Sequence, residues 1–245
     1  MPADVALHKL TLSKEKLLDL DPSERYVFAI AGHVFNETML LQKLVIISPP
    51  PEGSHQFIKD ASVGSAIFAL RILIGKTEEA MKILMKESVD SVLRDKFFSL
   101  VDGLEVRWDD AKAKYKDLPW LKKIRNSRSF HYMNESQWNP YLIGDICHDA
   151  YVIVGKTHGN TFFHWQEMAA ALPMMKLVND EKPFEGLATI LDEMGALLND
   201  VGSCLADGMQ AFMHQRLAGD GGLSDAEILN VPNMKETRLN YFYAD

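Results

Sequence analysis

The chain of 245 residues is 47% hydrophobic and 24% charged, and its net charge is −8 at pH 7. This composition supports a sizeable apolar core and excludes an intrinsically disordered chain. No apolar run is long enough to span a membrane, the N-terminus lacks the pattern of a signal peptide, and two cysteines cannot form a disulfide framework. We therefore expect a cytoplasmic protein with a single domain, residues 1–245, in which Cys147 and Cys204 are buried as small apolar side chains.

The first half of the chain has the patterns of long helices. Asp21-Pro22-Ser23-Glu24 combines an N-cap, a proline at the first helical position and an acid at the third, which predicts the start of a helix. Apolar residues then recur at steps of four and three as far as Ser48, which precedes three prolines. Further helices are predicted over residues 54–74, 77–85, 89–101 and 108–115.

The second half contains the one predicted departure from helix. Runs of β-branched and aromatic residues at 151–154 and 161–165 flank a turn with Gly159 and Asn160, which predicts a β-hairpin over residues 151–165. A wide apolar face predicts a helix from Phe184 to Leu217, followed by a tail, residues 219–245. The predicted fold class is all-α, a helical bundle with a small β-hairpin insertion. Its predicted core contains Val27, Val34, Leu41, Phe68, Leu191, Leu198 and Leu205.

The stretch Leu121–Tyr132, here called the motif segment, has the sequence LKKIRNSRSFHY. Its Arg125, Asn126 and His131 supply a fixed cation, an amide and a titratable imidazole, the groups needed to cleave RNA without a metal ion. On a helix near residues 121–135, Arg125 and His131 would lie about 120° apart around the axis and about 9 Å along it. They could converge on one phosphate if the helix began near Arg125 or if a second copy completed the site.

Positive charge is concentrated around the motif segment, although the whole chain is acidic. Residues 112–128 contain seven basic side chains against one acid, Asp117, a net charge of +6. Lys and Arg provide most of the affinity of proteins for the phosphates of nucleic acids. We therefore predict that Lys122, Lys123 and Arg128 bind RNA. A run of charges is also typical of a helix face exposed to solvent, and this alternative stays open.

The motif segment resembles the signature of the HEPN superfamily, in which an Arg, usually followed by a polar residue such as Asn, precedes a His by a few residues. The resemblance implies a helical bundle that forms a homodimer and acts as a metal-independent endoribonuclease without a cofactor. It implies that His131 is the general acid or base, that Arg125 stabilises the phosphate and that Asn126 orients either group or the phosphate. It also implies a toxin or phage-defence context, with an antitoxin or other regulatory protein as a possible partner.

A different class of protein fits the same residues. In a non-catalytic bundle that mediates dimerisation or binds a nucleotide or protein, His131 would cap a helix end and Arg125 would pair with an acid. An unrelated enzyme is a third reading. A phosphate-binding loop is excluded, because Leu70 and Ala150 stand where the two Gly-Lys-Thr sequences would need an earlier glycine. The spacing of His148, His158 and His164 fits no metal site on one helix face, so we predict solvated or hydrogen-bonded histidines there.

Overall fold

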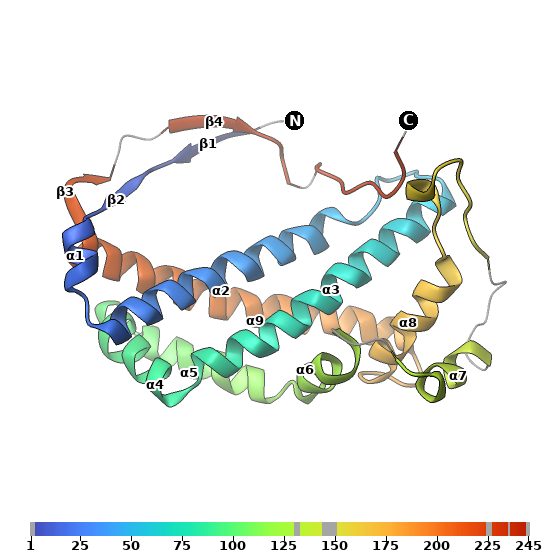
Figure 1. Cartoon of the computed structure of the whole chain (residues 1–245), viewed down its shortest axis with the longest axis horizontal. Coiled ribbons are helices and arrows are strands. Elements are labelled where there is room, and N and C mark those ends of the chain that lie inside the picture. The colour runs from blue at the N-terminus through green and yellow to red at the C-terminus, as the bar shows by residue number, and fades with distance from the viewer. Residues whose placement is uncertain (1–2, 130–132, 144–150, 224–226, 235, 244–245) are drawn as a thin grey trace. The chain divides into compact units, whose positions relative to one another are not determined.

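The fold is mainly helical, as predicted (Figure 1). The structure is a computed structural model, and it describes residues 3–129, 133–143, 151–223, 227–234 and 236–243. The longer helices are α2 (Pro22–Ile47), α3 (Gln56–Leu84), α5 (Leu104–Lys116), α8 (His164–Lys176) and α9 (Pro183–Phe212). Shorter helices are α1 (Lys14–Asp19), α4 (Glu87–Val92), α6 (Pro119–Ile124) and α7 (Glu135–Ile143). In the described part of the chain, no helix is long and apolar enough to cross a membrane.

The chain forms two compact units, which are described separately. Unit 1 comprises Met1–Met39, Glu79–Leu118 and Ala196–Asn233, and unit 2 comprises Leu40–Glu78, Pro119–Gly195 and Met234–Asp245. Helices α2, α3 and α9 each contribute residues to both units.

The predicted start of α2 in unit 1 is confirmed. The helix begins at Pro22, and the backbone N–H of Asp21 donates to the Glu24 carboxylate at 3.2 Å, which is half of a capping box. Val27 and Val34 are buried on one face of α2. Aromatic rings fill the core of this unit: Phe97 stacks on Phe212 with 4.2 Å between ring centroids, and Phe98 packs against Trp108. Gly208 of α9 leaves room for the Phe98 ring, which a Cβ there would meet at 2.7 Å.

A cluster of charged side chains joins α4 to α5 in unit 1. The Asp90 carboxylate accepts hydrogen bonds from Trp108 Nε1 at 2.6 Å, from Arg94 at 3.1 Å and from Lys112 at 3.2 Å. Arg94 also pairs with Asp109. Burial raises the pKa of Asp90, but the three hydrogen bonds outweigh it and hold the pKa below the usual range of an aspartate. We call Asp90, Arg94, Trp108, Asp109 and Lys112 the Asp90 cluster.

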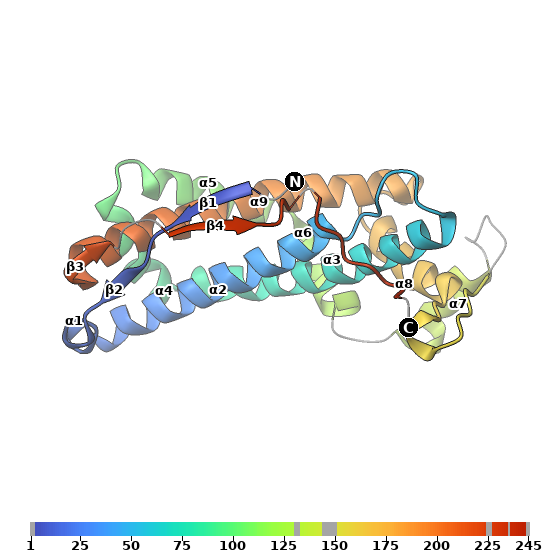
Figure 2. The same ribbon diagram turned by 90° about the horizontal axis from the view of Figure 1, so that it is seen from above.

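The two ends of the chain form β-structure in unit 1 that the sequence did not predict. Strand β1 (Ala3–Leu7) pairs antiparallel with β4 (Glu227–Val231), and the two run side by side in Figures 1 and 2. Strand β2 (Leu10–Leu12) pairs antiparallel with β3 (Ala218–Leu223). Strand β3 contains Gly219, Gly221 and Gly222, which lie at the start of the predicted tail. Glycine disfavours strands locally, so only pairing with β2, about 200 residues away in sequence, stabilises the strand.

Two predicted core positions are wrong. Phe68 of α3 is 56% exposed and Leu191 of α9 is 41% exposed. Each lies one position from a buried neighbour, Ile67 or Ile190, and one position turns a helix by about 100°. Val27, Val34, Leu198 and Leu205 are buried as predicted, and Leu41 is half-buried. Cys204 is also buried, which raises the pKa of its thiol to about 11, whereas Cys147 lies outside the described residues.

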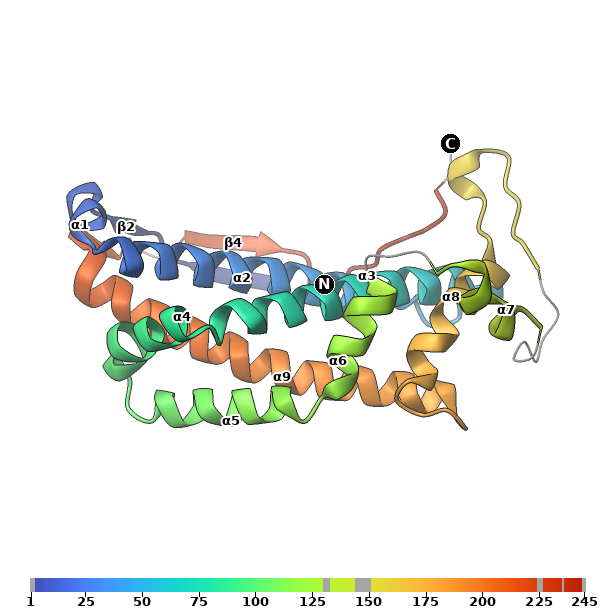
Figure 3. The ribbon, with the colours of Figure 1, turned by 60° about the horizontal axis from the view of Figure 1, so that its bottom comes forward.

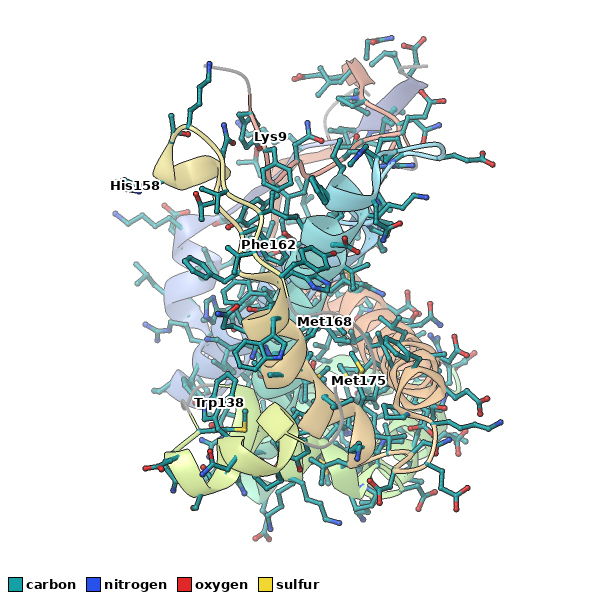
Figure 4. The ribbon with its side chains drawn as sticks, turned by 90° about the vertical axis from the view of Figure 1, so that its right-hand side faces the viewer. Lys9, Trp138, His158, Phe162, Met168 and Met175 are labelled. Carbon is teal, nitrogen blue, oxygen red and sulfur yellow. The ribbon has the colours of Figure 1, made fainter. Side chains whose placement is uncertain are left out.

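The predicted hairpin in unit 2 is present in a reduced form. Ile153 and Phe162 form an antiparallel bridge with backbone hydrogen bonds of 2.9 and 2.8 Å, and a 3-10 turn at His158–Asn160 reverses the chain. The second predicted strand stops early, because His164 and Trp165 belong to α8. Figure 4 shows Phe162 at the base of this loop, His158 at its tip, and Met168 and Met175 along α8.

Candidate functional site

The motif segment begins on α6, which is fixed in unit 2 by buried side chains. Pro119 occupies the first helical position, and Trp120 Nε1 donates to the Glu193 carboxylate of α9 at 2.7 Å. Leu121 and Ile124 are fully buried. Figure 3 shows α6 against α9. The side of α6 that carries Lys122 and Lys123 is therefore left facing solvent, and both lysines are exposed.

Arg125 and Asn126 lie together where α6 ends. The helix widens here into a π-helical turn, Arg125–Ser129, as the chain also does at Leu93–Phe97 and Met213–Leu217. Arg125 Nη1 donates to the Asn126 side-chain oxygen at 2.9 Å, and Ser127 Oγ donates to the Lys123 carbonyl at 2.7 Å. Arg125 is half-buried and Asn126 is exposed. The Asn126 amide thus bonds the Arg125 guanidinium, and the role predicted for Asn126 in orienting a catalytic group stays a prediction.

The remaining predicted residues of the motif segment fall outside these contacts. His131 lies outside the described residues, and of Arg128 only the backbone is described. The helix expected near residues 121–135 is shorter than expected, since the α-helical turns end at Ile124, the π-helical turn ends at Ser129, and Met133 and Asn134 are not helical.

The basic stretch around the motif segment divides into two kinds of cation. Lys112 and Lys114 of unit 1 are paired with acids, Lys112 with Asp90 and Asp109 at 3.2 Å and Lys114 with Asp200. Lys122 and Lys123 of unit 2 have no acid within ion-pair distance among the residues that the structure describes. The net charge of +6 over residues 112–128 therefore overstates the charge that is available to a polyanion. Lys116 of α5 is exposed, as are Lys122 and Lys123 of α6.

A second group of polar side chains in unit 2 was missed by the sequence analysis. Tyr151 donates its phenolic hydrogen to Asp60 of α3, and Gln56 donates to the other oxygen of that carboxylate at 2.8 Å. His164 stacks on Tyr151 with 4.5 Å between ring centroids, and its Nε2 lies 4.0 Å from Asp60. Burial and the bond to Asp60 raise the pKa of Tyr151 to about 12. This phenol therefore stays protonated as a hydrogen-bond donor across the physiological pH range.

The structure describes two of the three histidines that the sequence analysis compared. His164 is held by Tyr151 and Asp60, His158 is exposed, and His148 lies outside the described residues. No three His, Cys, Asp or Glu side chains in the described ranges are placed to hold a metal ion. The first Gly-Lys-Thr sequence lies within α3, where Thr77 donates to the Leu73 carbonyl, so it forms no phosphate-binding loop.

No family model, no curated protein and no solved structure matches this chain. A functional assignment therefore depends on the residues of the chain itself. The motif segment is the stronger candidate site, because it combines a guanidinium oriented by an amide with two exposed lysines.

Proposed function

We propose that the protein is a metal-independent endoribonuclease of the HEPN type. The observation that supports the proposal is the Arg125–Asn126 hydrogen bond of 2.9 Å, at a π-helical turn that directly follows the exposed Lys122 and Lys123. A guanidinium with a fixed orientation can form paired hydrogen bonds to one phosphate, and nearby lysines hold the adjoining strand. His131 follows six residues after Arg125 and supplies the imidazole.

The proposed chemistry is transfer of a phosphate ester within the RNA strand. The 2′-oxygen attacks the adjacent phosphorus, and its proton passes to an imidazole. The bond between phosphorus and the 5′-oxygen breaks, and the leaving oxygen takes a proton from a second imidazole. Arg125 stabilises the negative charge that develops on the phosphate oxygens. The products carry a 2′,3′-cyclic phosphate and a 5′-hydroxyl.

This reaction needs two proton-transferring groups, and the motif segment has one histidine. We propose that a homodimer supplies the second, with the motif segments of two copies facing one RNA strand. An uncontrolled ribonuclease harms its own cell, so an antitoxin or other regulatory protein completes the proposal. The protein would then act in the cytoplasm, as a toxin or in defence against phage.

Cleavage of RNA in the presence of EDTA tests the proposal. His131→Ala should lower the rate by about 10²- to 10⁴-fold, the usual contribution of a general acid or base, while light scattering and circular dichroism stay unchanged. His158→Ala is the matched control, because His158 is exposed at the tip of a loop and should leave the rate unchanged. If the wild-type protein cleaves no RNA and His131→Ala unfolds the chain, Arg125 and His131 are structural and the alternative of a non-catalytic bundle is correct.

A further inference from the structure

Unit 2 contains a cleft that the proposed ribonuclease does not use. It forms where the start of α3, the loop after Tyr151 and the C-terminal tail meet, and its volume is about 340 Å³. Its lining is almost entirely apolar and includes His55, Phe57, Ile58, Ile153, Asn160 and Phe242. No side chain of this lining carries a full charge when His55 is neutral.

Hydrogen bonds hold the tail and the loop in place around the cleft. Leu239 N–H donates to the Ile47 carbonyl at 2.9 Å, and the Tyr241 hydroxyl donates to the Thr161 carbonyl at 2.9 Å. The Asn160 side chain bonds both the N–H and the carbonyl of Tyr243, at 3.0 and 2.8 Å. Phe242 lies between Tyr241 and Tyr243, which these bonds hold in place, so Phe242 is a fixed part of the wall of the cleft.

Gly155 lets the loop close at this point. A Cβ at position 155 would lie 2.4 Å from the Asn160 carbonyl oxygen, closer than any real contact. Only glycine therefore allows the two arms of the loop to approach each other here and form one wall of the cleft.

The aromatic rings of the cleft form a corner. The ring of His55 meets the ring of Phe57 edge to face, with 4.8 Å between centroids and 71° between planes. Phe57 also contacts Tyr151, which is anchored on Asp60. Edge-to-face and offset-stacked pairs are the preferred arrangements of aromatic rings. A third ring entering this corner can stack on one side chain and meet the edge of the other.

A hydrogen-bond donor of His55 indicates which kind of aromatic ligand fits the cleft. The Phe57 N–H donates to His55 Nδ1 at 3.2 Å, so Nδ1 is the acceptor and the neutral imidazole carries its proton on Nε2. The Asn160 amide is already bonded to Tyr243. His55 Nε2–H is thus a donor available to an acceptor atom on the ligand.

We propose that this cleft binds a neutral planar heteroaromatic compound, one fused ring system with a ring-nitrogen acceptor that faces His55 Nε2. The volume lies near the lower end of about 300–1,000 Å³ for small-molecule sites, which suits a single fused ring rather than a peptide. The apolar lining selects a neutral ligand, since a charged one would lose its hydration without a counter-charge. The proposal is independent of the ribonuclease activity.

Benzimidazole and indole are matched probes for this site. They have nearly the same shape, but only benzimidazole has a ring nitrogen that accepts a hydrogen bond. Titrations followed by ligand-observed and protein NMR should show saturable binding of both, with benzimidazole tighter. His55→Phe keeps an aromatic ring without the donor, and it should reduce benzimidazole binding to the level of indole binding, which should not change.

Two tryptophan variants test where the probes bind. Ile58 and Val63 are both 39% exposed on α3, but only Ile58 lines the cleft. Ile58→Trp should fill the cleft and weaken benzimidazole binding roughly tenfold or more, whereas Val63→Trp should leave it unchanged. The proposal is overturned if benzimidazole shows no saturable binding, if Ile58→Trp binds it as the wild type does, or if His55→Phe does not remove its advantage over indole.

Discussion

The Asp90 cluster of unit 1 and the motif segment of unit 2 both contain arginine and lysine, but the two regions differ in whether the lysines have acidic partners. In the Asp90 cluster, every charged group contacts a partner of opposite charge: Arg94 and Lys112 each contact both Asp90 and Asp109. In the motif segment, Lys122 and Lys123 are exposed and contact no acid in the described part of the chain. Paired charges connect helices, whereas unpaired charges remain available for a ligand.

Burial explains why the two regions differ. Asp90 must accept the indole N–H of Trp108, whose side chain is fully buried, because an unsatisfied donor there would cost about 1–3 kcal/mol. Lys122 and Lys123 pay no such cost, since their ammonium groups stay in water. Substitutions in the Asp90 cluster should therefore affect the stability of the fold, and substitutions in the motif segment should affect the binding and cleavage of RNA.

Removing the shared acceptor of the cluster should have the larger effect on stability. Asp90→Ala leaves the Trp108 N–H without its partner and should lower the free energy of unfolding by about 2 kcal/mol, measured by chemical denaturation. Asp109→Ala is the control, because Asp109 is more exposed and should cost less than about 1 kcal/mol. Equal losses in the two variants would contradict the central role of Asp90.

The Asp90 carboxylate should make the stability of the fold depend on pH. Its pKa is lowered in the folded state, so its contribution is present above the usual aspartate pKa and is lost as the pH falls through the lowered value. The wild type should lose more stability than Asp90→Ala between neutral pH and strongly acidic pH. Parallel stability curves for the two proteins would show that Asp90 does not contribute through its charge.

The exposed lysines should control affinity for RNA without affecting stability. The double variant Lys122→Ala/Lys123→Ala should bind single-stranded RNA roughly tenfold more weakly at 0.1 M salt and reduce the slope of log K against log salt by about 1.4, which fluorescence anisotropy can measure. Its free energy of unfolding should change by less than about 0.5 kcal/mol. The exposed pair Lys43→Ala/Lys59→Ala, with the same loss of charge, is the control. Equal effects of the two double variants would mean that only net charge matters.

Tyr151 should have the smallest effect, a loss of stability at high pH. Its pKa is raised to about 12 in the folded state, so the bond to Asp60 stabilises the fold below the usual tyrosine pKa of about 10 and is lost between pH 10 and pH 12. The wild type should lose more stability over this interval than Tyr151→Phe, as followed by circular dichroism. An equal loss would show that the phenol is not held by Asp60 in solution.

The sequence predicted those helices whose signals are local. The cap and proline at Asp21-Pro22 predicted the start of α2, and a wide apolar face predicted α9. The predicted core position Phe68 on α3 was off by one residue, because apolar residues also occur on the exposed side of this helix. Periodicity gives the type of an element more reliably than its orientation.

What the sequence did not predict depends on contacts between distant residues. Strands β1 to β4 form only because the two ends of the chain pair, and β3 alone reads as a glycine-rich loop. Tyr151 and Asp60 are 91 residues apart, and neither has a neighbouring motif that suggests a hydrogen bond. Arg125 and Asn126, in contrast, are adjacent in sequence, so their contact could be anticipated from the motif segment alone.

The most direct test of the account compares Arg125→Ala and Arg125→Lys in a cleavage assay with single-stranded RNA and EDTA. If the guanidinium oriented by Asn126 holds the phosphate, Arg125→Ala should abolish cleavage, and Arg125→Lys should recover only a small part of it, since an ammonium cannot form paired hydrogen bonds. Both variants should keep the helical circular dichroism of the wild type. Full activity in Arg125→Ala, or the absence of cleavage by the wild-type protein, would contradict the account.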